Sequence, residues 1–276
     1  MTTHRKNILS ILFIVLIGIV LYGSTMKGSL GNASSSEEYS ALTKPGEVFE
    51  SSHERSPFAM LLAMRENKTV ELNEELARFS SPDVAYINQK FYSFFPPGIP
   101  VLIWPLYVLG SQYDLGVVAG YATIPIISIG VLVLLFAISR EIFRMPIFAS
   151  MLSALIFAFA TTSWSYAITI YQHIPITFCM LLAFYAAWKF KNAGVKISWF
   201  WGLASGVAYA VSVFIDYPAA LLLAPALSYL ILNAFSFVKT TIGIKRILGI
   251  LFPVQQAVPA AAGARLASLL MKAVAL

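Results

Sequence analysis

Charge is what this chain has least of. Only 12% of its 276 residues are Asp, Glu, Lys or Arg, whereas 58% are hydrophobic. Soluble domains carry about 25% charged residues, so the composition excludes an ordinary soluble fold. Apolar runs of membrane-spanning length recur along the chain. They predict an all-α, polytopic transmembrane protein whose first partner is the lipid bilayer.

Cysteine is nearly absent, and several binding motifs are missing. Cys179 is the only cysteine, which excludes an internal disulfide and a Cys-based metal site. The sequence has no Walker loop, no dinucleotide-binding glycine pattern and no HExxH motif. These absences disfavour ATP-driven transport and redox chemistry. No metal ligands are predicted, and the need for a divalent metal ion as cofactor stays open.

The apolar runs and the basic residues together predict a topology. Spans are expected at residues 8–23, 115–138, 146–165, 172–189, 197–214 and 218–238, with a weaker run after 247. Basic residues precede the first span and follow the second, fourth and sixth, so all fall on one side. They are Arg5 and Lys6, Arg140 and Arg144, Lys189, Lys191 and Lys196, and Lys239, Lys245 and Arg246. The positive-inside rule makes that side the cytoplasm. We therefore expect a multi-pass protein of the plasma membrane with a cytoplasmic N-terminus. The net charge of +6 is explained by topology and does not indicate nucleic acid.

Four regions follow from this pattern. They are a first transmembrane helix acting as a signal anchor (1–23), an extracytoplasmic loop (24–114), a helical bundle (115–252) and an alanine-rich segment (253–276). The basic and apolar start also fits a secretory signal peptide, but no clear cleavage site follows it. Residues 96–110 are apolar, short and rich in proline, so we expect an interfacial or re-entrant helix there. The composition of the last segment indicates a truncated or altered C-terminus.

The polar loop is the region where chemistry is expected. Residues 24–96 hold ten of the thirteen carboxylates of the chain. Within them, Glu54 and Arg55 precede an apolar stretch, 58–64, that is expected to lie along the membrane surface. Glu54 in that position can act as a general base toward a hydroxyl, and Arg55 can hold a phosphate. The alternative is a solvated ion pair in a flexible loop.

A second polar cluster lies between residues 81 and 98. Asp83, Lys90 and Tyr92 stand there among several aromatic residues, a mixture suited to binding a sugar or a lipid phosphate. The alternative is an aromatic belt at the membrane boundary.

Two further polar residues stand at predicted outer ends of helices. His173 follows the third span and Asp216 follows the fifth. His173 is either a ligand-binding residue or a hydrogen-bonded structural histidine. Asp216 is either functional or a hydrated residue capping a helix.

Several runs together resemble a known family. Residues 54–64, beginning Glu54-Arg-Ser-Pro-Phe, and residues 88–107, beginning Asn88-Gln-Lys-Phe-Tyr-Ser, are similar to the first outer loop of GT-C type membrane glycosyltransferases related to protein O-mannosyltransferases. Residues 165–175 and 215–221 resemble later outer turns of these proteins. The likeness covers about residues 1–240, and many members have Asn-Gly where this chain has Asn88-Gln89.

The resemblance implies an enzyme that moves a sugar from a polyprenyl-phosphate donor, its cosubstrate, to a hydroxyl or amide of a glycan, lipid or protein acceptor on the extracytoplasmic face. An acidic residue of the loop would be the base, with Glu54 first, Asp83 second and Glu38 third. Arg55 and Lys90 would bind the donor phosphate. Tyr92, His173 and Asp216 are expected to bind the substrate because of the polar positions described above. The chain is short for the family, so its activity alone stays open. The alternative function is a non-catalytic transporter or an envelope-assembly subunit that uses the loop for docking.

Overall fold

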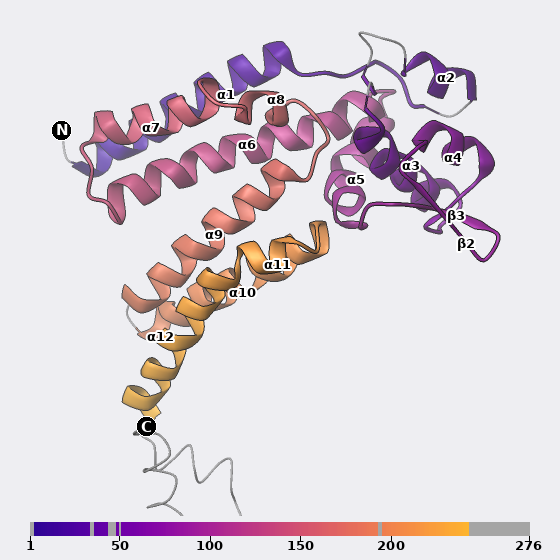
Figure 1. Ribbon diagram of the computed structural model, residues 1–276. Helices are drawn as coiled ribbons and strands as arrows, with labels where there is room; N and C mark the ends of the chain where they lie inside the picture. The colour runs from indigo at the N-terminus through magenta and orange to yellow at the C-terminus, as the bar shows by residue number, and fades with distance from the viewer. Residues whose placement is uncertain (1–2, 34–35, 44–47, 50, 193–194, 243–276) are drawn as a thin grey trace, which may run out of the picture. The chain divides into compact units, whose positions relative to one another are not determined.

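The computed structural model describes residues 3–33, 36–43, 48–49, 51–192 and 195–242 (Figure 1). The chain divides into two units, 1–230 and 231–276. The predicted weaker run after 247 and the alanine-rich segment 253–276 lie outside the described residues.

Within these residues the chain forms twelve helices and three strands. The helices are α1 (Thr3–Thr25), α2 (Ser36–Ala41), α3 (Ser52–Glu66), α4 (Glu74–Ser80), α5 (Gly98–Ser111), α6 (Gly116–Glu141), α7 (Ile147–Phe159), α8 (Ser163–Ala167), α9 (His173–Asn192), α10 (Val195–Ile215), α11 (Ala219–Leu222) and α12 (Ala224–Ile242). The strands are β1 (Glu71–Leu72), β2 (Val84–Ile87) and β3 (Lys90–Ser93). The prediction of an all-α polytopic membrane protein is confirmed, and the small sheet in the loop is an addition to it.

Four described helices are long and apolar enough to cross a membrane: His4–Thr25, Gly116–Glu141, His173–Asn192 and Ile197–Ile215. The run predicted at 146–165 is instead split into α7 and α8. Helix α7 has 13 residues and is about 20 Å long, less than the hydrocarbon thickness of a bilayer. The Thr161 hydroxyl accepts the Ser163 N–H at 3.1 Å and donates to the Phe157 carbonyl at 2.6 Å. Such side-chain bonds compete with the helix and end it here.

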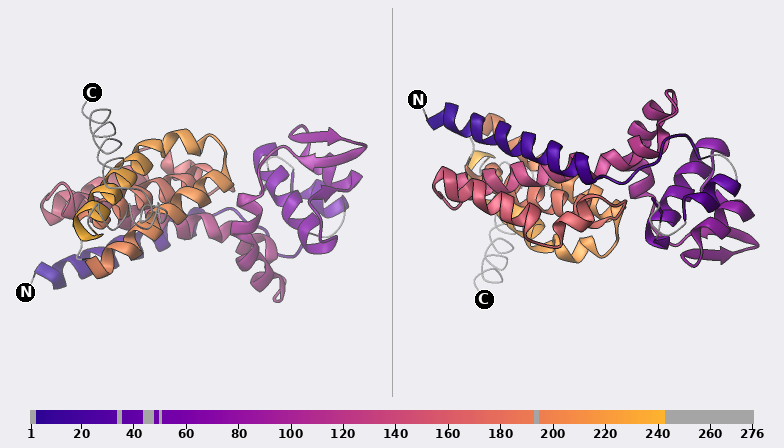
Figure 2. Two further views of the ribbon diagram at one scale, coloured as in Figure 1. Left: turned by 90° about the horizontal axis from the view of Figure 1, so that it is seen from below. Right: turned by 90° about the horizontal axis from the view of Figure 1, so that it is seen from above.

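The helices of the bundle pack closely within the first unit. Helices α1, α6 and α7 lie side by side (Figure 2) and share a core that includes Ile14, Leu132 and Ala154. Helix α9 packs against both α6 and α10. The side chains of Glu141 and Lys189 form an ion pair that joins the C-terminal ends of α6 and α9. Two of the predicted basic clusters therefore lie at the same end of the bundle.

The loop forms a packed subdomain with an aromatic core. The ring of Phe49 lies 4.5 Å from that of Phe58 and 5.4 Å from those of Phe79 and Tyr121. Tyr121 belongs to α6, so this core also joins the loop to the bundle. Residues 58–63 are all buried. The expected membrane-surface helix at 58–64 is therefore corrected: this stretch is the interior part of α3, because the loop supplies its own apolar partners.

The three strands form an antiparallel sheet in the order β1-β3-β2. Strands β2 and β3 make a hairpin in which Ile87 pairs with Lys90. The two turn residues, Asn88 and Gln89, have φ angles of +51° and +63°. Positive φ at both positions is typical of a type I′ turn, which favours Asn followed by Gly.

Replacement of Gln89 by Gly is expected to stabilise the protein by about 1 kcal/mol, because a side chain in the left-handed region is strained and glycine is not. Thermal unfolding of the detergent-solubilised protein measures this gain. Asn88→Gly is the control, and its effect is smaller because Asn tolerates this backbone conformation. An unchanged or lower Tm in Gln89→Gly contradicts the prediction.

The N-terminus of α5 packs directly on the end of α10. A Cβ built on Gly98 lies 2.4 Å from the Ile215 Cα and 2.5 Å from the Phe214 carbonyl oxygen, so only glycine fits. This contact brings the end of the loop to the 214–218 turn. Two segments that the topology predicts on one membrane face therefore meet in the structure.

Candidate active site

Glu54 is buried at the beginning of α3. The Ser51 hydroxyl accepts the His53 N–H at 3.2 Å and caps the helix. The Glu54 side chain is 1% exposed, and the Tyr121 hydroxyl lies 3.4 Å from its Oε1. The backbone amides of Ser51 and Ile170 also hydrogen-bond to the carboxylate. The solvated ion pair considered from the sequence is thus wrong for Glu54.

Burial also changes the acidity of Glu54. Loss of hydration raises the pKa of this carboxyl above its ordinary range, while the nearby charge of Lys27 and the hydrogen bonds lower it in part. The carboxylate connects α3 to α6 and to the turn before α9. Glu54 therefore holds these segments together from the inside of the protein.

The stability of the protein should depend on pH through Glu54. A raised pKa means that the folded state binds the proton more tightly than the unfolded chain does. Stability then falls as pH rises from the ordinary glutamate pKa, about 4.3, through the raised value. Glu54→Gln lacks this loss, so its Tm falls less than that of the wild type over this pH range.

Thermal unfolding in buffers of increasing pH measures the slope of Tm against pH for the wild type and for Glu54→Gln. Glu74→Gln, which removes an exposed carboxylate of α4, is the matched control and keeps the wild-type slope. Equal slopes in the wild type and Glu54→Gln contradict the prediction.

Asp83 and His53 form a partly exposed acid–base pair of the loop. The Asp83 Oδ2 lies 3.2 Å from the His53 Nδ1, and the two side chains are 20% and 55% exposed, respectively. The Asp83 carbonyl accepts the Phe94 N–H at 3.1 Å and the Ser56 hydroxyl at 2.7 Å. These bonds fix the start of the hairpin against α3. A carboxylate beside an imidazole can take up a proton and can orient the ring.

His53 was not selected as a site residue from the sequence, although it precedes Glu54. The fold is needed to find His53, because its partner Asp83 lies 30 residues further along the chain. An available signal was that His53 is the one histidine in the 24–96 loop.

Aromatic rings surround His53 and connect it to the turn before α9. The His53 ring lies 5.1 Å from that of Phe95 and 6.1 Å from that of Tyr171. Tyr171 and Tyr166 in turn contact the ring of His173, at 6.1 Å and 4.7 Å. The predicted substrate-binding residue His173 therefore joins the same cluster through aromatic contacts. Aromatic faces of this kind suit the binding of a sugar ring.

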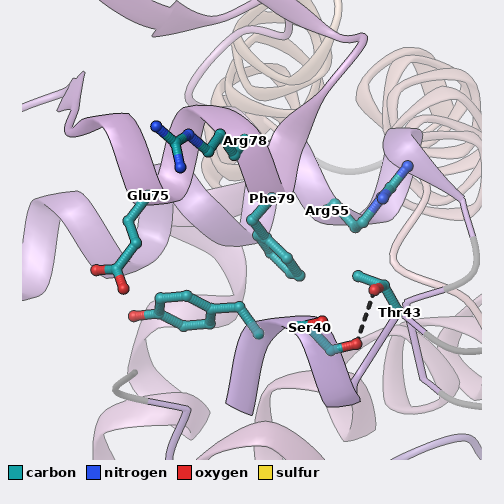
Figure 3. Close-up of a pocket in the computed structure, with 7 residues that line it drawn as sticks. Ser40, Thr43, Arg55, Glu75, Arg78 and Phe79 are labelled. Atoms are coloured by element: carbon teal, nitrogen blue, oxygen red, sulfur yellow. Dashed lines mark hydrogen bonds between the residues drawn. The ribbon is translucent and has the colours of Figure 1, made fainter. Parts of the chain in front are cut away.

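Arg55 lines a cavity of about 310 Å³ (Figure 3). The cavity is lined by Tyr39, Ser40, Thr43, Arg55, Glu75, Arg78 and Phe79. The Arg55 Nη2 donates to the Ser81 carbonyl at 3.0 Å, which ties the arginine to the turn that carries Asp83. Within the described residues, the buried Nε of Arg55 has no hydrogen-bond partner. A guanidinium group with donors left over is suited to an anionic ligand.

The other predicted site residues lie elsewhere. Lys90 forms an ion pair with Glu71 at 2.6 Å, and this bond raises the pKa of its ammonium group. Tyr92 stands on the central strand β3, opposite Ala85 and Glu71. Glu38, on α2, is exposed and lines a separate cavity of about 270 Å³ that also includes Asp114.

Asp216 lies just before the short helix α11, whose N-cap residue is Pro218. The Asp216 carbonyl accepts the Ala219 N–H at 3.0 Å at the start of α11. In the described chain, its carboxylate forms no hydrogen bond or ion pair with another predicted site residue.

The described residues also contain no group of three His, Cys, Asp or Glu side chains that could hold a metal ion. The structure thus groups Glu54, Arg55, Asp83 and His173 and leaves Glu38, Lys90 and Asp216 apart.

Comparison with known proteins identifies the family of this chain. The family model described as dolichyl-phosphate-mannose-protein mannosyltransferase matches residues 108–264, more than half of the chain. The matched region starts near the end of α5 and contains α6 to α12, whereas the candidate acids of the loop precede it. No curated protein sequence and no solved structure matches this chain. The protein belongs to the dolichyl-phosphate-mannose-protein mannosyltransferase family of GT-C membrane glycosyltransferases, which take their sugar from a polyprenyl-phosphate donor.

Proposed function

We propose that this protein transfers mannose from polyprenyl phosphate to a hydroxyl group of an acceptor protein at the extracytoplasmic face of the plasma membrane. The donor class and the protein acceptor come from the family. The observation that carries the proposed site is the partly exposed Asp83 carboxylate beside His53. Family membership supports transfer over the alternative of a non-catalytic transporter or assembly subunit.

Asp83 is the base in the proposed reaction. Its Oδ2 faces His53 and is buried, so the other carboxylate oxygen is left to accept a proton. The acceptor hydroxyl loses its proton to Asp83 while its oxygen forms a bond to the anomeric carbon of the sugar. The bond between that carbon and the phosphate oxygen breaks, and polyprenyl phosphate leaves with the electron pair. Glu54, which is 1% exposed, acts as a positioning residue through its hydrogen bonds with Tyr121 and the Ile170 amide.

Arg55 holds the charge of the leaving phosphate. Its guanidinium reaches the 81–83 turn from one side, and His53 reaches Asp83 from α3, two residues before Arg55. The cation that shares the cavity with Arg55 is Arg78, which also forms an exposed ion pair with Glu74 at 3.5 Å. Lys90, the second cation expected from the sequence, is engaged by Glu71. Two arginines that line one cavity can stabilise the negative charge that grows on the phosphate.

The charges of the helix ends support this sidedness. The Glu141–Lys189 ion pair supports the placement of two basic clusters at one end of the bundle. The candidate site lies with the opposite ends of these helices, since Glu54 contacts Tyr121 near the start of α6 and Ile170 just before α9. With the bases in the cytoplasm, the site faces outward.

A transfer assay with single-carboxylate variants tests the proposal. The purified full-length chain is supplied with polyprenyl-phosphate mannose and a peptide that contains serine and threonine, and transfer is compared among Asp83→Asn, Glu54→Gln and Glu38→Gln. Asp83→Asn is expected to lose activity most strongly. If Glu54→Gln or Glu38→Gln loses more activity while remaining folded, the base is not Asp83.

A further inference from the structure

Strand β2 is an open edge of the sheet and begins one residue after Asp83. In the order β1-β3-β2, the strand pairs only with β3, from Val84 opposite Ser93 to Ile87 opposite Lys90. An edge strand presents unpaired N–H and C=O groups to a further extended chain. The proposed base therefore stands at the start of an available β-edge.

The register shows which backbone groups face outward. The Phe94 N–H donates to the Asp83 carbonyl at 3.1 Å, which makes these two residues a hydrogen-bonded pair. Because such pairs alternate in an antiparallel ladder, Ala85 and Ile87 bond to β3, whereas Val84 and Tyr86 turn their backbone groups to the open edge. The Val84 N–H already donates to the Pro82 carbonyl at 2.8 Å. Within the described residues, no backbone partner occupies the N–H or the C=O of Tyr86.

A groove of about 480 Å³ runs beside this edge. Val84, Tyr86 and Phe91 line it from the sheet, and Glu74 and Arg78 line it from α4. The rings of Tyr86 and Phe91 lie 4.9 Å apart, and Tyr86 is 63% exposed. A chain that pairs with β2 would direct every second side chain into this groove. The edge offers main-chain bonds, and the groove offers side-chain contacts.

We propose that the acceptor binds as an extended polypeptide segment along β2, as a fourth strand of the sheet, and so carries its hydroxyl side chain to Asp83. This inference rests on the proposed function, because it takes Asp83 as the base. A polypeptide fits the edge because it repeats the N–H and C=O groups that the edge needs, whereas a glycan or a lipid tail does not. The hairpin also lies at the end of the loop region that is farthest from α7, α9 and α10 (Figure 1), where a segment of a folded or secreted protein can reach it.

Peptide binding to the full-length chain in detergent, without sugar donor, tests the inference. The Tyr86 N–H faces outward, so Tyr86→Pro removes it and leaves the β2–β3 ladder intact. Tyr86→Ala removes the same ring and keeps the N–H, which makes it the matched control. Tyr86→Pro is expected to weaken peptide binding about tenfold relative to Tyr86→Ala, in line with a lost hydrogen bond and a steric clash. Tyr113→Ala changes an exposed residue outside the hairpin and is expected to have no effect on peptide binding.

A peptide series on the wild-type protein covers the case in which Tyr86→Pro does not fold. Methyl groups are placed on single backbone nitrogens along the peptide. Strong weakening at alternate positions supports strand pairing, since only every second N–H of the peptide faces β2. Equal binding of all methylated peptides overturns the inference, as does equal binding by Tyr86→Pro and Tyr86→Ala.

Other occupants of the edge give different results, and each of them overturns the inference. A Tyr86→Pro variant that changes from dimer to monomer shows that the edge pairs with a second copy. Loss of vesicle binding without loss of peptide binding shows that the hairpin contacts the bilayer. A failure of the proposed base gives a different result. Full transfer activity of Asp83→Asn would overturn the role of Asp83 as the base, but it would not change the peptide binding that is measured without sugar donor.

Discussion

Asp83→Asn is expected to lower the rate of sugar transfer by about 10²–10⁴-fold, the range found when a general base is removed. Asparagine keeps the size of the side chain and its contact with His53, but its amide cannot take the proton of the acceptor hydroxyl. The change should therefore lower kcat and leave the KM of the peptide nearly unchanged, which steady-state kinetics at saturating donor can measure.

Two further variants make this result specific. Asp114→Asn removes an exposed carboxylate outside the hairpin and the proposed site, and it should keep wild-type activity. His53→Gln should lower kcat less than Asp83→Asn does, because it removes only the group beside the base. If Asp83→Asn retains a rate within a few-fold of the wild type, the proposed mechanism is excluded.

Gly98→Ala is expected to cost about 3 kcal/mol of stability and to reduce activity as well. The added Cβ lies 2.4 Å from the Ile215 Cα and 2.5 Å from the Phe214 carbonyl oxygen, and backbone atoms cannot rotate away. Overpacking of this kind forces neighbouring segments apart. The start of α5 would then leave the end of α10, and the hairpin that precedes α5 would lose its anchor.

Thermal unfolding in detergent and the transfer assay measure the two effects. Gly206→Ala is the matched control, because Gly206 lies in α10 and a Cβ there meets nothing within 4 Å. That substitution is expected to be neutral or to stabilise α10 by up to about 1 kcal/mol through helix propensity. A Gly98→Ala protein as stable and active as Gly206→Ala would rule out the close contact.

Much of the membrane architecture was predictable, because the length of an apolar run is a local property. The runs at 8–23, 115–138, 172–189 and 197–214 appear as α1, α6, α9 and α10 with ends shifted by a few residues. The run at 146–165 did not form one helix, since the Thr161 hydroxyl bonds to the backbone and ends α7. Hydropathy counts that hydroxyl only as mildly polar and does not register its competing hydrogen bonds.

The hairpin shows why the loop was harder to predict. Residues 84–93 read as a polar and aromatic cluster, and the Asn88-Gln89 turn lacks the glycine that marks a type I′ turn. The strand pairing is then stabilised by side chains from outside the segment, such as the Ser56 hydroxyl that donates to the Asp83 carbonyl. Contacts from distant residues decided the structure of this segment.

The sequence by itself determined the class of protein, the positions of its longest membrane helices and the family, because these depend on composition, apolar length and local motifs. Tertiary structure decided the environment of each candidate acid. Glu54 is enclosed by Tyr121, 67 residues away in the chain, and by the amide of Ile170, whereas Asp83 stays partly exposed beside His53. Burial and partners arise from packing between distant segments, and these two properties set which carboxylate can meet a substrate.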